Sequence, residues 1–485
     1  MKLRTRRIIM FTFILAFFIM APILIFYASG YRYDIKLGKI LKTGTLMLEA
    51  KGIKNASLYI NDKLYEKPFD EKIFVYNLLP GDYNIRLEKE NYYSWQKKIS
   101  IQSSLTTFVR DIIFFKKNIP LQIVDEPTAN FYLSPDEQKI AYIKKTELFS
   151  ELYLLDIRTK EKIFLYRASF PESDINLSWA ASSKKILAQI NNHYFVFNVQ
   201  QPEQILEIEE LLDFEPNNLK WDIGSDNILF ALKQNPQARA DQAASEIYKI
   251  DLLAKTKSKI FESQEELINQ EFFIEANDVF YIKKENTRDN LYKYNLNFKT
   301  TKLVTKLGRS ANYKFIKSTN NYLGLIDSDN QKLFLIQKII TSLEITIQSS
   351  SAIKEFNAIN AVWDRNEKWL LFHDGFEVKF FDTVANQEIF INRYGQKINR
   401  VCWHHELQHI VILFQNNLNI IDLGAENGER NVIEIIKFDQ LDNFYFAQKG
   451  EIIYFQGKIG RQEGCLLYTS PSPRDRTRPR MPSSA

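Results

Sequence analysis

A single arrangement of apolar and polar residues recurs along most of the chain. In each copy an apolar residue ends one short run, a polar stretch follows, and a second apolar residue begins the next run seven positions later. Four of the six tryptophans occupy the first position: Trp179, Trp221, Trp363 and Trp403. The second position holds Ile186, Ile228, Leu370 and Ile410, and the pairs Leu133–Ile140 and Ile316–Leu323 keep the same spacing. Short apolar runs separated by polar turns predict paired strands, so the pattern indicates a repeated strand–turn–strand unit.

The repeat has the period of a β-propeller blade. Its copies begin near residues 131, 177, 219, 272, 313, 361, 401 and 444, which are 40 to 53 residues apart. A four-stranded blade of about 40–45 residues is apolar on both faces, and neighbouring blades in a closed ring cover these faces. We therefore predict a propeller over residues 119–464, with the repeated tryptophan filling the space between blades. Seven full units and a partial eighth at 444–455 leave seven and eight blades open, and Leu121–Val124 is a candidate closing strand.

The clearest copy of the repeat is Ser134-Pro135-Asp136-Glu137-Gln138-Lys139-Ile140-Ala141. It resembles the repeats of TolB-like and WD40-like propellers, in which Ser-Pro-Asp-Gly-x-x-Ile-Ala joins two strands. Glu137 stands where those repeats have glycine, and the other copies keep only the apolar frame. The resemblance implies the propeller fold but names no ligand.

A different pattern, of short alternating strands, fills residues 44–118. Tyr83, Ile85 and Leu87 alternate with polar residues, which is typical of a half-buried strand, and turns are indicated at Asn61-Asp62 and Leu79-Pro80-Gly81-Asp82. Several such strands predict a small β-sandwich. The stretch from Leu79 to Tyr92 resembles the PEGA domain signature, in which a Pro-Gly turn, a Tyr-x-Ile-x-Leu strand and Lys-x-Gly-Tyr follow one another. The resemblance implies a binding or spacer module of exported and surface proteins; an unrelated spacer sandwich is the alternative.

One residue departs from the PEGA pattern. Asn91 occupies the position where glycine is usual. Asparagine is, after glycine, the residue that best tolerates the left-handed backbone conformation. We therefore expect Asn91 to adopt a positive φ and to preserve the turn.

The N-terminal segment is apolar enough to cross a membrane. Ile8–Ala28 contains 21 uncharged residues, and a helix of that length spans roughly 30 Å of hydrocarbon. The basic leader at residues 1–7, with Lys2, Arg4, Arg6 and Arg7, predicts a cytoplasmic N-terminus. We expect an uncleaved single-pass signal-anchor at 8–28, a linker at 29–43 and everything beyond outside the cytoplasm, with Tyr27, Tyr31 and Tyr33 at the outer interface. A signal peptide cleaved near Ala28-Ser29-Gly30 and a buried soluble helix are the alternatives.

Composition narrows the possible partners. Apolar residues make up 45% and aromatic residues 14% of the chain, enough for a large core of strands. The net charge of +5 is concentrated at the two ends, and the body between them is close to −2, which argues against nucleic acid as a partner. Cys402 and Cys465 predict no structural disulfide. Residues 465–485, rich in Pro, Arg and Ser, are interpreted as a disordered tail that resembles translated adaptor sequence, a sequence artefact.

Three short motifs carry possible chemistry. His405-Glu406-Leu407-Gln408-His409 matches the zinc-protease pattern H-E-x-x-H, but that chemistry needs a helix and this motif occupies the turn of a repeat. Asp327-Ser328-Asp329-Asn330 suggests calcium, without the glycine and glutamate of a calcium loop. Asn55-Ala56-Ser57 fits the glycosylation triplet. We assign no catalytic, cofactor-binding or metal-binding residue and expect no cofactor.

The sequence thus predicts an all-β protein: a PEGA-like sandwich and a seven- or eight-bladed propeller behind one transmembrane helix. Our first hypothesis is a non-catalytic binding or scaffold protein of the bacterial cell envelope, whose propeller holds a protein, peptide or glycan. A propeller-type carbohydrate-active enzyme with paired carboxylates at the central mouth is the second. A structural surface-layer component is the third.

Overall fold

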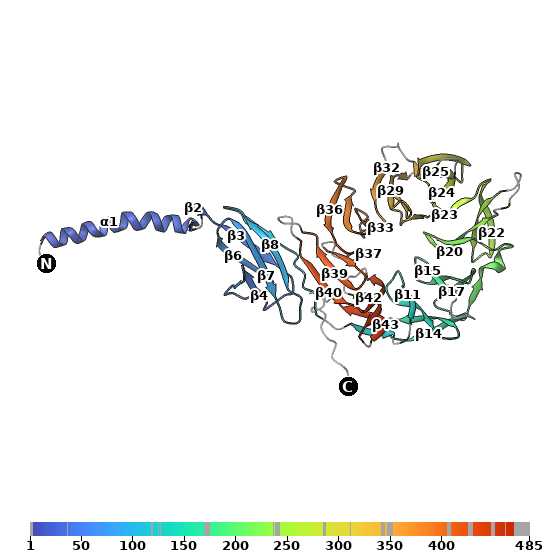
Figure 1. The fold of residues 1–485 in the computed structure, drawn as a ribbon, viewed down its shortest axis with the longest axis horizontal. Helices are drawn as coiled ribbons and strands as arrows, with labels where there is room; N and C mark the ends of the chain where they lie inside the picture. Colours follow the sequence, from blue (N-terminus) through green and yellow to red (C-terminus); the bar gives the residue numbers. More distant parts are fainter. Residues whose placement is uncertain are drawn as a thin grey trace, which may run out of the picture.

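The computed structural model describes residues 3–35, 37–117, 120–124, 126, 128–168, 175–235, 237, 243–284, 288–310, 312–340, 345–346, 353–404, 409–424, 430–447, 452–460 and 462–469. Within these residues the chain forms one α-helix, one short 3₁₀ helix (η1, Ile208–Leu211) and many strands. A helix, a small two-sheet unit and a ring of sheets follow one another along the molecule (Figure 1).

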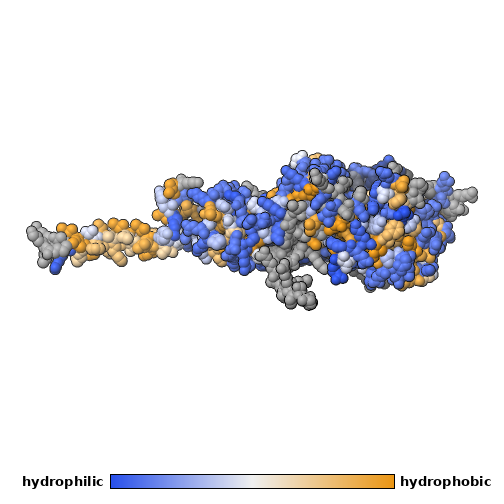
Figure 2. Space-filling view, turned by 90° about the horizontal axis from the view of Figure 1, so that it is seen from below, coloured by the Kyte–Doolittle hydropathy of each residue, from blue (hydrophilic) through white to orange (hydrophobic). Residues whose placement is uncertain are grey.

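Helix α1 (Leu3–Ala28) extends away from the rest of the protein (Figure 1). Its segment Ile8–Ala28 is long and apolar enough to cross a bilayer, and none of it is buried against the protein. Figure 2 shows this helix as a continuous apolar surface beside a largely hydrophilic body. The predicted apolar helix is confirmed, and its length and composition fit both a membrane anchor and a signal sequence.

The segment after the helix is folded rather than a plain linker. Strands β1 (Tyr31–Asp34) and β2 (Lys39–Lys42) form an antiparallel hairpin, with Tyr33 directly opposite Ile40. Asp34 closes its turn, because its side chain accepts a hydrogen bond from the Leu37 N–H and its carbonyl accepts one from the Gly38 N–H. Gly38 has a φ of +64°, which glycine adopts without strain.

Two facing sheets form the first β unit. One sheet has the order β6-β3-β9 and the other β5-β4-β7-β8. Their bounds are β3 (Gly44–Glu49), β4 (Ser57–Ile60), β5 (Lys63–Leu64), β6 (Lys72–Leu78), β7 (Gly81–Glu88), β8 (Trp95–Ile101) and β9 (Thr106–Val109). Leu46, Leu58, Ile85 and Trp95 lie in one buried core between the sheets. Asn91 has a φ of +64°, as expected from its place in the turn pattern.

The remaining strands form a β-propeller. In the part of the chain that the structure describes, β10 and all later strands except β30 and β31 build eight four-stranded antiparallel sheets, arranged as a ring in Figure 1. Each predicted repeat start falls within the first strand of one sheet. The pair β30 (Ile339–Ile340) and β31 (Ile345–Thr346) is a separate small sheet.

The first four sheets contain β11 (Thr128–Leu133), β12 (Lys139–Lys145), β13 (Ser150–Asp156) and β14 (Lys162–Ala168); β15 (Ile175–Trp179), β16 (Lys185–Ile190), β17 (His193–Asn198) and β18 (Ile205–Glu207); β19 (Asn218–Asp222), β20 (Ser225–Gln234), β21 (Ser245–Asp251) and β22 (Thr256–Ser263); and β23 (Leu267–Glu275), β24 (Asp278–Lys284), β25 (Asp289–Asn295) and β26 (Thr300–Lys306). The next three contain β27 (Tyr313–Phe315), β28 (Tyr322–Asp327), β29 (Lys332–Gln337) and β32 (Ile353–Asn357); β33 (Asn360–Trp363), β34 (Trp369–His373), β35 (Glu377–Asp382) and β36 (Gln387–Arg393); and β37 (Arg400–Trp403), β38 (His409–Leu413), β39 (Asn417–Asp422) and β40 (Val432–Lys437). The last is built by β41 (Gln440–Phe446), β42 (Ile452–Ile459), β43 (Gln462–Thr469) and β10 (Leu121–Val124).

The last sheet joins the two ends of the ring. Strand β10 pairs antiparallel with β43, so Leu121–Val124 supplies the closing strand that the sequence suggested. The predicted boundary after Gly464 is wrong, because β43 continues to Thr469 and Cys465 is fully buried in the sheet. The remainder of the proposed tail, residues 470–485, lies outside the described residues.

The repeated tryptophans link neighbouring sheets. Each indole Nε1–H donates to a backbone carbonyl at or next to the first strand of the preceding sheet, over 3.0–3.1 Å; the pairs are Trp179–Tyr132, Trp221–Ser178, Trp363–Lys317 and Trp403–Val362. The rings also lie in or against the apolar clusters between sheets. The predicted position of these side chains between blades is confirmed.

The turns after these first strands share one geometry. Glu137, Ser183 and Glu367 have φ values of +60°, +64° and +58°. In each turn the backbone N–H of this residue donates to the carbonyl three residues earlier, on Ser134, Ala180 or Asp364. Glu137 therefore adopts the conformation that glycine provides in the repeats that this segment resembles.

Candidate functional site

The first β unit, which we call the sandwich, is attached to the ring of propeller sheets through a shared apolar core. Ile113 and Phe115, which follow the last sandwich strand, belong to the same buried cluster as Leu418 and Phe455 of the last two sheets. The Phe115 ring contacts the rings of His404 and His409 edge-on, with centroids 5.8 and 5.7 Å apart. Because this apolar contact is buried, the sandwich and the ring are held against each other rather than loosely tethered. We call this contact the joint.

A buried ion pair lies at the same joint. Lys97 of β8 and Asp422 at the end of β39 are 3.4 Å apart, and their side chains are only 2% and 14% exposed. Lys97 lies on the inward side of β8 together with Trp95 and Ile99, where a charge needs a partner. Asp422 also accepts a hydrogen bond from the Gly424 N–H, which holds the turn after β39.

Gly424 makes room for the lysine. A Cβ atom at this position would lie 2.9 Å from Lys97 Nζ, closer than side-chain atoms normally approach. A side chain at this position would require the flexible end of Lys97 to shift.

A cavity of about 350 Å³ opens beside the ion pair. The sandwich contributes Trp95, Lys97, Phe108, Val109, Arg110, Asp111 and Ile112, and the propeller contributes Asp422 and Gly424. The Arg110 guanidinium lies 4.9 Å from the centre of the exposed Phe108 ring. Its lining combines aromatic side chains with two cations and two carboxylates, and Lys97 is already paired with Asp422, so Arg110 and Asp111 are the charged groups left to contact a ligand. We call this cavity the joint cavity.

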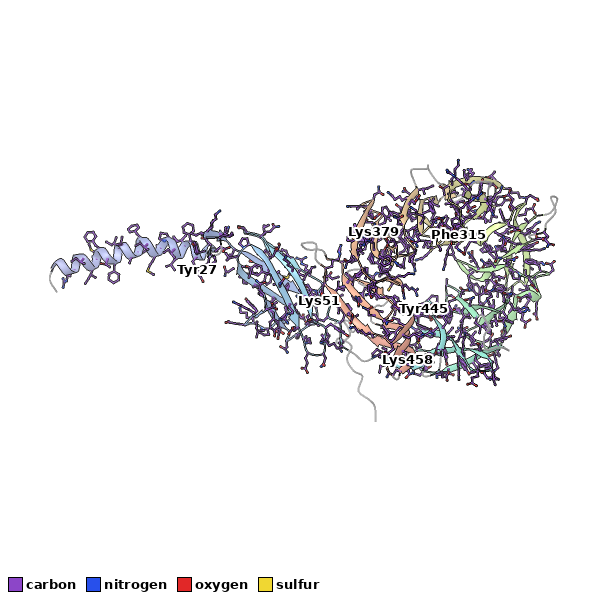
Figure 3. The ribbon with its side chains drawn as sticks, in the orientation of Figure 1. Tyr27, Lys51, Phe315, Lys379, Tyr445 and Lys458 are labelled. Atoms are coloured by element: carbon purple, nitrogen blue, oxygen red, sulfur yellow. The ribbon has the colours of Figure 1, made fainter. Side chains whose placement is uncertain are left out.

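The first strands of the sheets carry a second set of polar contacts, around the centre of the ring. Lys220 of β19 pairs with Glu271 of β23 at 2.5 Å, and Asn443 of β41 connects Arg400 of β37 with Asn130 of β11. Figure 3 labels Phe315 and Tyr445 at the inner edge of the ring. These contacts join neighbouring sheets, so the inner edge is a polar belt that connects blades.

The carboxylates of β23 are each paired with a lysine. Glu271 binds Lys220, and Glu275 binds Lys338, which also lies 2.6 Å from Ser318 Oγ. Burial lowers the pKa of Lys338, while Glu275 acts in the opposite direction. Since Glu275 and Lys338 come from neighbouring sheets, the cluster is a cross-link between blades. A glycosidase needs two carboxylates facing each other across a substrate, and this pairing does not provide that.

The described residues around the H-E-x-x-H motif belong to the ends of the paired strands β37 and β38. The His404 N–H donates to the His409 carbonyl at 2.9 Å, and His409 begins β38. His404 and His409 are both almost fully buried, whereas residues 405–408 lie outside the described residues. A buried strand residue at His409 does not fit the helix that zinc-protease chemistry requires, and the predicted turn itself falls on residues 405–408, outside the described residues.

The other motifs are occupied by local structure. Asp327 accepts hydrogen bonds from Asn330, and Asp329 accepts them from Ser310 and Asn312. Asn55 is exposed, and its backbone N–H donates to Asp70. Searching the described residues finds no group of three His, Cys, Asp or Glu side chains that could hold a metal ion. Both cysteines are free thiols, and burial raises the pKa of Cys465, which keeps it protonated.

The sequence predicted no site residue, and the joint was not predicted either. Two signals were present: Lys97 interrupts the apolar side of an alternating strand, and the aromatic Phe115 falls at the predicted domain boundary. Neither signal identifies its partner, because Asp422 lies more than 300 residues further along the chain.

Comparisons with known proteins place the ring among propellers and go no further. Neither protein-family models nor curated proteins match the chain. Similar solved structures include the C-terminal WD40 domain of Sif2 (13% identity, 73% of this chain and 99% of that one, TM-score 0.47) and the Dos1 propeller (10%, 73% and 95%, TM-score 0.47). An oligogalacturonate lyase in complex with manganese is also similar (9%, 72% and 90%, TM-score 0.40). At these values the similarity supports no argument about function.

Proposed function

We propose that the protein is a non-catalytic, membrane-anchored scaffold of the cell envelope, with its sandwich and an eight-bladed propeller outside the cytoplasm. The ligand we propose is an envelope protein, peptide or glycan that binds in the joint cavity and contacts Arg110. The sandwich, whose sequence resembles a PEGA domain, would hold the propeller next to the membrane. The proposal takes α1 as an uncleaved anchor with a cytoplasmic N-terminus.

The joint is the observation that carries this proposal. A spacer that only separates a propeller from a membrane needs no buried contact with it. Here Phe115 is fully buried between sandwich and ring, and Lys97 meets Asp422 across the same contact. A fixed joint presents a surface in one orientation and places a cavity between two domains, where ligand sites commonly occur.

The enzyme and surface-layer alternatives have less support. Among the described inner-ring residues, the carboxylates Glu271 and Glu275 are neutralised by lysines. A carboxylate held in such an ion pair stabilises the ring, and Glu271 and Glu275 are therefore poor candidates for the acids of glycan cleavage. A surface-layer protein would assemble with its own copies and would not need a cavity that accepts a foreign group.

A pull-down with the full chain in lipid nanodiscs tests the proposal. Immobilised protein is exposed to solubilised envelope proteins and to purified cell-wall glycan. We expect saturable retention of one ligand, about 10- to 100-fold weaker with Arg110→Ala, since a hydrogen bond to a charged group contributes about 1.5–3 kcal/mol. Lys63→Ala, which removes an exposed cation on β5, is the matched control and should bind normally.

Three results would contradict the proposal. Equal retention by Arg110→Ala would place the ligand away from the joint cavity. Shortening of the glycan during incubation would support the enzyme alternative. Ordered self-assembly without retention of any ligand would support the surface-layer alternative.

A further inference from the structure

The β1–β2 hairpin exposes an unusual number of apolar side chains. Ile35 is 88% exposed, and Tyr33, Leu37 and Ile40 are each 61–62% exposed. Tyr33 and Ile40 face each other across the hairpin, and Ile35 and Leu37 lie in its turn. Four large apolar side chains within eight residues form a contiguous apolar tip, which isolated exposed residues elsewhere on the surface do not.

The hairpin is held at the end of the apolar helix. The Arg32 guanidinium donates to the Tyr27 carbonyl at 2.7 Å and lies 3.6 Å from the centre of the Tyr27 ring. The rings of Phe26 and Tyr31 contact each other edge-on at 5.4 Å. The helix end and the hairpin are therefore a connected unit, and Figure 1 places β2 directly beside the last turn of α1.

Contacts on the other side connect the hairpin to the sandwich. Thr43 donates to the Gly30 carbonyl through both its N–H and its hydroxyl, and Ser103 Oγ donates to the Lys42 carbonyl. Leu105, on the same sandwich loop, is 55% exposed. These contacts hold the base of the hairpin directly after the end of the candidate span, where a bilayer would have its headgroups.

The charges around the tip favour an anionic surface. Lys39 and Lys42 are exposed along β2. Within the described residues of the hairpin the carboxylate is Asp34, which lies opposite Lys39, is 8% exposed and accepts the Leu37 N–H in the turn. Apolar side chains flanked by lysines are the combination that binds the headgroup region of membranes containing anionic lipids.

We propose that the β1–β2 hairpin is a second membrane contact. Its tip enters the headgroup region of the bilayer that α1 crosses, and Lys39 and Lys42 bind anionic headgroups. This inference rests on the proposed membrane anchor. With two contacts instead of one, the sandwich cannot rotate freely about the helix end, so the propeller keeps a fixed tilt above the membrane.

Depth-dependent quenching tests the inference on the full chain. Single cysteines at Ile35→Cys, Lys63→Cys and Phe17→Cys, in a Cys402→Ser/Cys465→Ser background, carry an environment-sensitive fluorophore in nanodiscs of phosphatidylcholine and phosphatidylglycerol. Brominated lipids serve as the quencher. We expect at least twofold quenching at position 35 and at position 17, and none at position 63, which lies on β5 of the sandwich. Lys39→Glu/Lys42→Glu should reduce the quenching at position 35 at least by half.

The three labels separate the two proposals. Quenching at position 17 without quenching at position 35 would overturn the hairpin contact and leave the anchor intact. Absence of quenching at position 17 would overturn the anchor and with it both proposals. A label at position 35 that is shielded from aqueous iodide and also unaffected by brominated lipid would assign the tip to a second copy of the chain, which also overturns the lipid contact.

Discussion

The contacts between blades and the contact between sandwich and ring are built in different ways. Between blades, the tryptophan at the equivalent position of four repeats donates a hydrogen bond to a backbone carbonyl of the preceding sheet. At the joint, Lys97, Asp422 and Phe115 each occur once, and two of the three are charged. The tryptophan contact is repeated along the ring, whereas the joint is unique and partly ionic, as are the single ion pairs between blades such as Lys220–Glu271.

The difference follows from what each contact must do. A blade needs a neighbour on both sides, and any neighbour with the same surface serves, so repetition is sufficient. The joint must select one pair of sheets from the ring, and a buried charge selects its partner because mispairing leaves it unsatisfied. Apolar burial supplies most of the stability in both places, and the ion pair adds orientation.

Removing an inter-blade tryptophan should have the largest effect. Trp363→Ala should lower the free energy of unfolding by about 3–5 kcal/mol, because the ring is buried between two sheets and beside Tyr322. Trp363→Phe is the matched variant: it keeps most of the apolar volume and loses the hydrogen bond to Lys317. Chemical denaturation of the full chain in detergent measures both. Equal stability of wild type and Trp363→Ala would show that the repeated position does not support the ring.

Breaking the ion pair should have an intermediate effect. Lys97→Met leaves Asp422 without its cation and should cost about 2–3 kcal/mol, since the pair is nearly buried but Asp422 keeps some contact with water. Lys97→Met/Asp422→Asn removes both charges and keeps an oxygen for the Gly424 N–H, so it should recover at least half of that loss. Denaturation of the four proteins of this cycle gives the coupling. Purely additive losses would contradict a specific pairing.

The smallest effect should come from one turn of the repeat. Glu137→Gly should stabilise the protein by up to about 1 kcal/mol, because glycine adopts a φ of +60° without strain. Gln138→Gly, at the next position of the same turn, should instead lower stability by about 0.5–1 kcal/mol through added freedom of the unfolded chain. Thermal unfolding of both variants measures these changes in stability. Destabilisation by Glu137→Gly would mean that the Glu137 side chain contributes more than the backbone strain costs.

The sequence was sufficient for everything that repetition or periodicity encodes. The spacing from Trp179 to Ile186, and its recurrence, predicted the blades and the inter-blade contact. The 21 apolar residues from Ile8 to Ala28 predicted the helix. Asn91 and Glu137 stand where the patterns they resemble have glycine, and both have a positive φ.

Features that depend on a single pairing of distant residues could not be predicted from the sequence. The joint joins Lys97 to Asp422 and Phe115 to His404, and no local pattern specifies partners so far apart. The hairpin was predicted as a linker, because its strands are only four residues long and Lys39–Lys42 lacks the alternation of a half-buried strand. The boundary near Gly464 was placed five residues too early, since the change in composition does not coincide with the end of β43.

The pairing of β10 with β43 sets the order in which the protein can mature. Leu121 lies opposite Leu467, so the ring closes only after the chain has been made as far as β43. Until then the incomplete ring has two unpaired sheet edges, which are templates for aggregation. Contacts of such long sequence separation also form slowly. Until β43 pairs with β10 the ring is therefore an open arc, and the rate of its closure determines how long the two edges stay exposed.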